Sequence, residues 1–207
     1  MGDVGIYERY VLPRLINFLL NLPEYTEIRA RVCAPLEGSV LEVGFGSGLN
    51  VAHYPPAVSR VLAVDPALLG RKLAARKVAD SPVPVEFIGL DGQSLPLDSG
   101  SVDHALSTWT LCTIPDAEQA MAEIVRVLRP GGTFHFVEHG HSPSPKVAQW
   151  QDRLTPIQKR VAGGCHLNRP IDDIVAGSGL AVDKIDNHYM SGPKPYGYIF
   201  EGTATKP

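Results

Sequence analysis

Cysteine is scarce in this sequence, and its few copies are far apart. The three cysteines, Cys33, Cys112 and Cys165, are odd in number, and no two of them form a C-x-x-C pair. A disulfide framework or a zinc ribbon would need cysteines at short, paired spacings, so neither is expected. Unpaired cysteines are typical of a reducing compartment, and we therefore expect a cytoplasmic protein.

The sequence also lacks clusters of positive charge. Its net charge is −3, and lysine and arginine do not occur in runs. A protein that binds nucleic acid routinely neutralises phosphates with grouped cations. Nucleic acid is therefore not expected as a partner.

No apolar run is long enough to cross a membrane. A span needs about 20 mostly apolar residues, whereas the longest apolar run, residues 11–22, is shorter and is interrupted at Pro13, Arg14, Asn17 and Asn21. Charges at Asp3, Glu8 and Arg9 also break the apolar core of any signal peptide. We expect no transmembrane segment, and only peripheral contact of this amphipathic segment with a membrane surface stays open.

Short β-type runs alternate with helical stretches along most of the chain, which is typical of an α/β sheet. Asp116, followed three residues later by Gln119, indicates the start of the clearest helix. A chain of 207 residues with 44% apolar residues can form a single domain, residues 1–207. The pattern predicts strands at 39–43, 60–64, 84–88, 102–107, 133–138, 180–186 and 197–203, and helices at 68–78, 117–128 and 170–177.

Two segments lie outside this alternation. Residues 1–37 carry an amphipathic helical segment, and residues 139–169 form a long excursion with three prolines and a glycine pair. In an open parallel sheet, ligands bind beyond the carboxyl ends of the strands. We expect both segments to cover the ligand-binding core at 38–138 and to shape a second pocket. Residues 139–169 would form the substrate side of that pocket. Residues 170–207 would add a helix and the last strands.

The main chemical signal is a glycine-rich turn directly after the first strand. Gly44, Gly46 and Gly48 let the backbone pass close to a ligand, because side chains there would fill the space. Nicotinamide dehydrogenases use a similar turn, with a further glycine or alanine for pyrophosphate binding and helix packing. Leu49 fits that fingerprint poorly, which disfavours a dehydrogenase.

Two carboxylates near the turn indicate a different ligand. Glu42 lies two residues before the first glycine, where it would repel a pyrophosphate but suits an ammonium group. Asp65 ends the second predicted strand, about 20 residues downstream, where a carboxylate can accept hydrogen bonds from both ribose hydroxyls. A ribose without pyrophosphate, together with an amino-acid ammonium group, describes S-adenosylmethionine.

The order of motifs across residues 38–138 resembles that of class I S-adenosylmethionine-dependent methyltransferases. Those motifs are E-x-G-x-G-x-G at 42–48, D-P at 65–66, D-G-Q at 91–93, S-V-D at 101–103 and L-R-P-G-G at 128–132. Within that class the chain is similar to the methyltransferase-like group of small-thiol methyltransferases and its bacterial relatives, through Asn50, Y-P-P at 54–56, L-C at 111–112, E-H at 138–139 and G-C-H-L-N-R at 164–169. The resemblance implies a Rossmann-like sheet of seven mostly parallel strands, with helices on both faces and the last strand antiparallel.

The resemblance also implies S-adenosylmethionine as cofactor and gives roles to individual residues. The glycines would line the methionine moiety, Asp65 would hold the ribose and Asp91 would accept from the adenine amino group, although an Asp-Gly pair is often only a turn. The full set of expected cofactor-binding residues is Tyr10, Glu42, Gly44, Gly46, Gly48, Asn50, Asp65, Pro66, Asp91, Gly92, Gln93, Thr108 and Leu111.

Candidates for the acceptor side lie in the excursion. His139 and His166 are the candidate bases, although ordinary loop histidines would fit the sequence equally well. His139 and His141 are two residues apart with no cysteine pair beside them, so no metal is expected. Arg169 would bind an anionic substrate group or neutralise nearby aspartates. A tryptophan such as Trp150 could line an apolar substrate pocket, or it could simply pack in the core. The expected substrate contacts are His141, Trp150 and Arg169.

The sequence thus predicts methyl transfer to a small-molecule acceptor. A thiol ionises near pH ~8.5 and needs only modest help, whereas a phenol needs a true base. The lack of an unmistakable base favours a thiol. A phenol, a quinone-like ring or a phospholipid amine remains an alternative acceptor, and a catalytically silent cofactor-binding module is the alternative of another class. The oligomeric state is not indicated.

Overall fold

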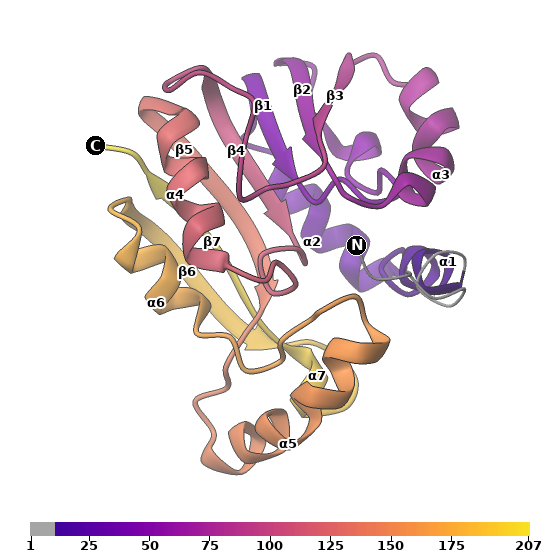
Figure 1. The fold of residues 1–207 in the computed structure, drawn as a ribbon, viewed down its shortest axis with the longest axis vertical. Helices are drawn as coiled ribbons and strands as arrows, with labels where there is room; N and C mark the ends of the chain where they lie inside the picture. The colour runs from indigo at the N-terminus through magenta and orange to yellow at the C-terminus, as the bar shows by residue number, and fades with distance from the viewer. Residues whose placement is uncertain (1–10) are drawn as a thin grey trace.

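The computed structural model describes residues 11–207, which form a seven-stranded sheet (Figure 1). The strand order is β3-β2-β1-β4-β5-β7-β6. β1 to β5 pair in parallel, and β7 runs antiparallel to both β5 and β6. The predicted fold class is therefore confirmed, including the antiparallel last strand. The strands are β1 Gly38–Val43, β2 Val58–Val64, β3 Val85–Gly89, β4 Val102–Thr108, β5 Leu128–His139, β6 Ala181–Tyr189 and β7 Tyr198–Thr205.

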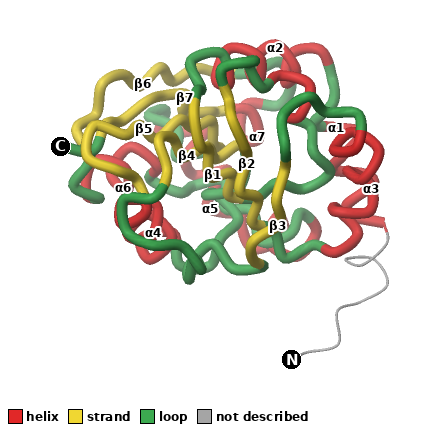
Figure 2. Tube along the Cα trace, turned by 90° about the horizontal axis from the view of Figure 1, so that it is seen from above, coloured by secondary structure: helices red, strands yellow, loops and turns green. Residues whose placement is uncertain are grey.

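Apolar layers cover both faces of the sheet. Side chains alternate along a strand, so Leu41 of β1 packs in the core beneath α4 and α6, while its neighbour Val40 packs with α2 and α3. Figure 2 shows α2 on one side of the sheet and α4 and α6 on the other. The helices of the described residues are α1 Leu12–Leu19, α2 Pro23–Cys33, α3 Leu68–Ala79, α4 Ala117–Val127, α5 Pro145–Val161, α6 Ile171–Gly177 and α7 Lys194–Gly197, with a short 3-10 turn, η2, at Val51–His53.

The strand order reverses between β1 and β4. From β1 the chain moves outward to β2 and β3, and then crosses to β4 on the other side of β1. Because the two connections leave in opposite directions, a crevice forms beyond the carboxyl ends of β1 and β4, which is where open α/β sheets bind ligands. The glycine-rich turn follows β1 at this edge, and residues 109–112 follow β4.

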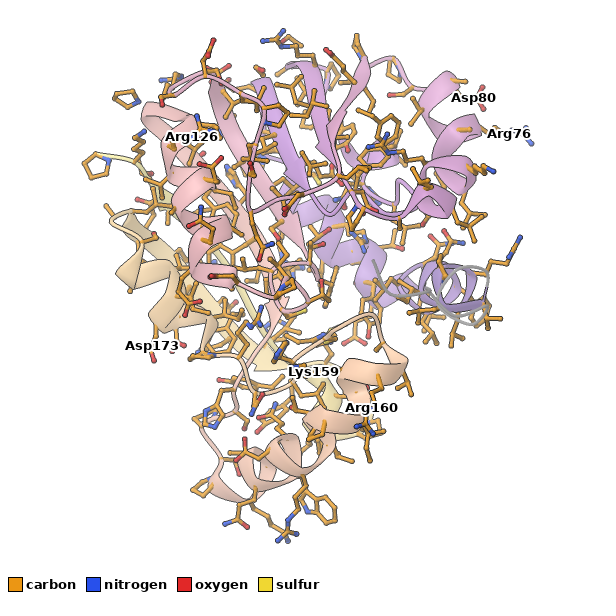
Figure 3. The ribbon with its side chains drawn as sticks, viewed as in Figure 1. Arg76, Asp80, Arg126, Lys159, Arg160 and Asp173 are labelled. Carbon is orange, nitrogen blue, oxygen red and sulfur yellow. The ribbon has the colours of Figure 1, made fainter. Side chains whose placement is uncertain are left out.

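Helix α4 follows the sequence prediction closely. The Asp116 side chain accepts a hydrogen bond from the Gln119 amide (2.9 Å) and caps the helix. Arg126 near its end donates to the carbonyls of Leu95 and Leu97 (3.0 and 2.7 Å), which ties the helix to the loop before β4. Figure 3 shows Arg126 at the opposite end of the molecule from Lys159 and Arg160 of α5.

The predicted turn at 129–132 lies inside β5. The pairing of β5 with β4 jumps from Leu128 to Thr133, and Gly131 has a φ of 74°, which a glycine adopts without the steric cost of a Cβ. Arg129 in this turn pairs with Asp103 (2.6 Å). The turn therefore ends α4 as predicted, and regular pairing resumes at Thr133.

Two segments contain more helix than the sequence predicts. The excursion holds the 17-residue helix α5, which begins at Pro145 and contains Pro156. A proline is favoured in the first turn of a helix, because its missing N–H has no partner there, so Pro145 is compatible with the start of α5, whereas Pro156 lies inside it. The N-terminal segment forms two helices, the second of which begins at Pro23.

Helices α1 and α5 of these two segments lie at the carboxyl edge of the sheet (Figure 1). Ser47 of the glycine-rich turn donates to the Asn17 side chain of α1 (2.6 Å). The His166 amide, beyond α5, donates to the Cys112 carbonyl (2.9 Å). No helix within residues 11–207 has the length and apolar character needed to cross a membrane.

The core under α4 provides a stability test. Ile124 is fully buried on α4, whereas Ile157 on α5 is 59% exposed. Ile124→Ala should lower the free energy of unfolding by about 2–4 kcal/mol, because it removes buried methyl groups and leaves a cavity. Ile157→Ala, the same chemical change at the surface, should change it by less than about 0.5 kcal/mol. Urea unfolding measures both, and equal effects would contradict the packing described here.

Candidate active site

The glycine-rich turn is shaped by contacts on two of its glycines and by open space at the third. Gly44 lies so close to Thr110 that a Cβ would come within 1.9 Å of its side chain, and a Cβ on Gly48 would press on Ala74 at 3.1 Å. A Cβ on Gly46 would meet nothing closer than 4.0 Å. All three have positive φ. Protein therefore fills the space beside Gly44 and Gly48, whereas Gly46 leaves room for a ligand.

Asp65 connects the second strand to this turn. Its buried carboxylate accepts hydrogen bonds from the Gly46 amide (2.7 Å) and the Ala67 amide (2.6 Å). Burial raises the pKa of Asp65, and the two amides oppose that shift. Each oxygen has a further lone pair, so the carboxylate fixes the turn and can still accept from a ligand. Pro66, next to it, is exposed.

The turn at 91–93 lies against the end of β1. A Cβ on Gly92 would come within 2.8 Å of the Val43 side chain. Asp91 accepts from the Gln93 amide (2.8 Å), and the Gln93 side-chain oxygen accepts from the Asp116 amide (2.8 Å). The structure thus brings Asp91, Gly92 and Gln93 to the same edge as Gly46 and Asp65.

A buried polar network lies beneath the glycine-rich turn. Asn50 donates to the Glu42 carboxylate (3.0 Å) and to the Thr108 hydroxyl (3.0 Å). Arg29 of α2 donates to the same hydroxyl (2.7 Å) and to the Asn50 side-chain oxygen (2.8 Å). The Tyr54 hydroxyl also donates to Glu42. Glu42, Asn50 and Thr108 are therefore joined as one unit.

This network holds two charged side chains away from water. Burial raises the pKa of Glu42 to about 7 and lowers that of Arg29 to about 10. The Arg29 guanidinium lies 4.8 Å from the centre of the Trp109 ring, which stabilises it through a cation–π contact. Its Nε is buried without a hydrogen-bond partner. An unpaired buried donor is costly, and the bonds to Asn50 and Thr108 and the Trp109 ring are the contacts that hold Arg29 in place.

Glu138, at the end of β5, positions the loop that follows β4. Its fully buried carboxylate accepts from the Ser107 hydroxyl (2.6 Å) and from the amides of Thr110 (3.1 Å) and Cys112 (3.0 Å). Burial raises the pKa of Glu138, and these donors oppose that shift. The loop also holds Trp109 at a φ of 51°, a strained value for a bulky side chain.

Several acceptor-side candidates meet at this loop. Arg169 donates to the carbonyls of Leu111 and Ile114 (both 2.6 Å), and its Nη2 lies 3.1 Å from His166 Nδ1. Burial, with a smaller effect of the Arg169 charge, lowers the pKa of His166. His139 Nδ1 lies 3.6 Å from the Cys165 sulfur. Arg169 thus braces the loop, and within residues 11–207 it forms no ion pair with the neighbouring Asp172 or Asp173.

The other predicted residues have different surroundings. His141 is exposed, although its amide donates to the Arg169 carbonyl (2.9 Å). Trp150 on α5 is 48% exposed beside Arg153. Leu111 is fully buried in the core under α4 and α6. Tyr10 lies outside the described residues.

Comparison with known proteins identifies the architecture. The family model described as "Methyltransferase domain" matches residues 41–136, the stretch from β1 to β5. Human thiol S-methyltransferase TMT1A is 32% identical over 79% of this chain and 66% of its own length, and rat TMT1B is 35% identical over 64% and 56%. The demethylmenaquinone methyltransferase of Clavibacter sepedonicus is 28% identical over 59% and 50%. The chain belongs to the class I S-adenosylmethionine-dependent methyltransferases.

Solved methyltransferase structures share this fold. A Bacillus halodurans protein described as a methyltransferase aligns with a TM-score of 0.73 at 17% identity, covering 89% of this chain and 99% of its own. An S-adenosylmethionine-dependent methyltransferase of Thermotoga maritima aligns with a TM-score of 0.68 at 21% identity, covering 97% and 98%. The matched region spans about half to two thirds of the curated relatives quoted above.

Sequence reasoning missed three residues that shape the candidate site. Arg29 lies in α2, within the segment expected to be helical, but has no motif around it. Tyr54 and Glu138 were noted only as part of the family resemblance, and no role was predicted for either. A signal existed for Glu138 alone, because a carboxylate at the end of an otherwise apolar strand needs buried partners.

The buried Glu42 makes stability depend on pH. Its folded pKa, about 7, lies above the ordinary value of 4.5, so between these values the folded chain holds a proton that the unfolded chain releases. Stability should therefore fall as pH rises through this window. Glu42→Gln removes that effect, and the stability of wild type relative to this variant should drop by about 3 kcal/mol between pH 4.5 and pH 8.

Urea unfolding at several pH values measures the difference. Glu86→Gln, the same change at an exposed position of β3, is the matched control and should follow the wild-type curve. Wild-type and Glu42→Gln curves that run parallel across the window would contradict the burial of an ionisable Glu42.

Proposed function

We propose that this chain transfers the methyl group of S-adenosylmethionine to the sulfur of a small thiol. The observation that carries the proposal is the space at Gly46, where a Cβ would meet nothing closer than 4.0 Å. That space is bordered by Asp65, by the turn at 91–93 and by the network around Glu42. These are the positions that the family resemblance assigns to the cofactor.

The described residues fit this cofactor in shape and polarity. Gly46 would let the methionine moiety approach the backbone, and Asp65 would accept from the ribose hydroxyls with its remaining lone pairs. Glu42, Asn50 and Thr108, joined with Arg29 in the buried network, would hold the turn from below. Asp91, Gly92, Gln93 and Pro66 are proposed beside the adenine, where Leu90 exposes half of its surface. Tyr10 and Leu111 keep their proposed cofactor roles.

When bound, the cofactor supplies an electrophilic methyl group on a sulfonium. The chain has to orient an acceptor opposite the departing sulfur and exclude water, and such orientation can account for many powers of ten in rate. Trp109, packed on Tyr25 at 5.0 Å between ring centres, would form an apolar wall. Helices α1 and α5 lie at the same edge and would close the site.

A thiol acceptor fits this site better than a hydroxyl. Two of the relatives quoted above carry the name thiol S-methyltransferase. Thiolates form near neutral pH with modest help, whereas a phenol needs a base matched to it. His139 and His166 are proposed for that help, since both lie at the loop after β4. Acceptor contacts are less well supported for the remaining three candidates. His141 and Trp150 are exposed, and the Arg169 guanidinium already donates to backbone carbonyls.

Methylation of a quinone-like ring is the second candidate. It is favoured by the 28% identical demethylmenaquinone methyltransferase. The exposed apolar residues of α1, among them the 68% exposed Phe18, would suit an acceptor in a membrane surface.

A panel of acceptors distinguishes these functions. Labelled S-adenosylmethionine would be offered with small alkyl and aryl thiols, the corresponding phenols and amines, and a quinol in detergent. We expect label in thioether products, with the matched phenols much slower. Preference for the quinol would support the second candidate. Tight cofactor binding with no product in the whole panel would identify a silent binding module instead.

Asp65 provides the test of the cofactor site. Asp65→Ala should weaken S-adenosylmethionine binding at least about tenfold, because losing an acceptor for two ribose hydroxyls costs roughly 1.5–3 kcal/mol. Isothermal calorimetry measures the affinity. Asp80→Ala, at the exposed end of α3 (Figure 3), is the matched control and should bind as wild type does.

Two further measurements complete this test. Asp65→Asn keeps one acceptor for the Gly46 amide and should fold normally while still binding more weakly, which separates loss of the turn from loss of ribose contacts. NADH should not compete with the cofactor. Unchanged affinity in both Asp65 variants, or preference for NADH, would overturn the cofactor assignment.

A further inference from the structure

Cys112, His139 and Cys165 form a compact cluster, which we call the Cys2His cluster. The two sulfurs are 3.8 Å apart, and the Cys165 sulfur lies 3.6 Å from His139 Nδ1. All three ligand atoms lie within 4.8 Å of one another. The residues are far apart in sequence, and they come from the loop after β4, the end of β5 and the loop after α5. No cysteine is in a disulfide.

Two of the three separations, from the Cys165 sulfur to the Cys112 sulfur and to His139 Nδ1, match those around a tetrahedral zinc ion. With zinc–sulfur bonds of about 2.3 Å and zinc–nitrogen bonds of about 2.0–2.1 Å, tetrahedral geometry puts two sulfurs about 3.8 Å apart and sulfur and nitrogen about 3.6 Å apart. A disulfide would need sulfurs at about 2.05 Å. The cluster therefore has the spacing of metal ligands.

The surroundings suit a dication held by two thiolates. Cys112 is fully buried and Cys165 nearly so, and they pack with Leu154 and Leu167. Two thiolates and one Zn²⁺ carry no net charge, so such a unit avoids the cost of an unpaired charge in an apolar place. The backbone of Cys112 is fixed on both sides, because its amide donates to Glu138 and its carbonyl accepts from the His166 amide. Bracing of this kind positions metal ligands.

Three protein ligands leave one position of a tetrahedral ion open. Within residues 11–207, no further histidine, cysteine or carboxylate belongs to this group. Structural zinc sites have four protein ligands, whereas catalytic sites have three and bind water or substrate in the fourth position. Thr110, two residues before Cys112, packs directly on Gly44 of the glycine-rich turn, so the loop that carries Cys112 also contacts the proposed cofactor site.

We propose that Cys112, His139 and Cys165 bind a Zn²⁺ ion whose open fourth position takes the sulfur of the methyl acceptor. The acceptor part rests on the proposed function. The metal site departs from the sequence-based expectation of no metal, which rested on the short spacing between His139 and His141 and on the lack of a cysteine pair. It also supplies the activation for which the sequence shows no clear base.

The transfer balances with the groups named. An acceptor thiol loses its proton to solvent as its sulfur binds Zn²⁺. A lone pair of that sulfur then forms the new carbon–sulfur bond as the bond from the methyl carbon to the sulfonium sulfur breaks, and S-adenosylhomocysteine takes the electron pair. The product is a neutral thioether, a weaker zinc ligand than a thiolate, and it leaves. The metal keeps its oxidation state.

Metal binding is tested on the full chain without reference to activity. Protein purified under reducing conditions with zinc should contain about one zinc per chain after dialysis, and Co²⁺ in its place should give the charge-transfer and visible bands of a tetrahedral thiolate site. Cys112→Ser, Cys165→Ser and His139→Asn should each weaken Zn²⁺ binding by roughly a hundredfold or more, since loss of a ligand should exceed the effect of losing a bracing residue.

Matched controls are present in the chain. Cys33→Ser changes the remaining buried cysteine, and His141→Asn changes the exposed histidine two residues from His139; both should bind zinc as wild type does. If the cluster variants fold poorly, wild type alone answers the question, because zinc should protect Cys112 and Cys165 from alkylation. Three results would overturn the site. They are loss of zinc from the wild type on dialysis, a loss of zinc affinity in Cys33→Ser equal to that in the cluster variants, and alkylation of the cysteines that zinc does not slow.

The open position is tested by ligand exchange. Adding 2-mercaptoethanol to the Co²⁺ protein should intensify the thiolate charge-transfer band, whereas ethylene glycol should not. A spectrum that ignores the thiol would overturn the proposal. These readouts separate the two claims. Thiol methylation that survives complete removal of metal would support the proposed function and overturn the zinc site's role. Metal binding with thiol exchange but without methylation would support the zinc site and overturn the proposed function.

Discussion

The buried carboxylate of Glu138 is the interaction on which the functional edge of this methyltransferase depends. An ionised group inside an apolar core is costly unless donors surround it. The available donors are the Ser107 hydroxyl and the amides of the loop after β4. The carboxylate therefore draws that loop against the end of β5 and fixes its backbone.

The consequences of this contact reach both halves of the site. With its amide on Glu138, Thr110 fills the space beside Gly44, which leaves Gly46 as the open glycine of the turn. The same carboxylate holds Cys112, and so aligns its sulfur with Cys165 and His139. One buried charge thus sets the positions of the cofactor turn and of the Cys2His cluster. Arg169 supports the loop from the other side by binding its carbonyls.

A second buried network supports the cofactor turn from below. Arg29 and Glu42 form no direct ion pair within residues 11–207. Asn50 bonds to both of these side chains, and Thr108 bonds to Arg29 and Asn50. Such an arrangement gives each buried ionisable group polar partners. It also joins helix α2, an element outside the matched family region, to the proposed cofactor site.

Local sequence patterns were enough to predict much of the fold. Alternating strands and helices, the Asp116 cap and the glycine-rich turn each report interactions between near neighbours in sequence, and for that reason the seven-stranded sheet and the edge at which Gly46, Asp65 and Asp91 meet could be predicted. Helix α5, which begins at Pro145, was not predicted within the excursion. A proline can begin a helix or interrupt one, and only the packing of the residues that follow it distinguishes the two cases.

By itself, the sequence determined the fold class, the methyltransferase family and the edge of the sheet where the cofactor would bind. Only the tertiary structure decided which buried side chains serve that edge. Arg29, Glu138 and the Cys2His cluster depend on partners up to 79 residues away in the chain. Their roles arise from the need to satisfy polar groups removed from water, and that need exists only once distant segments have packed together.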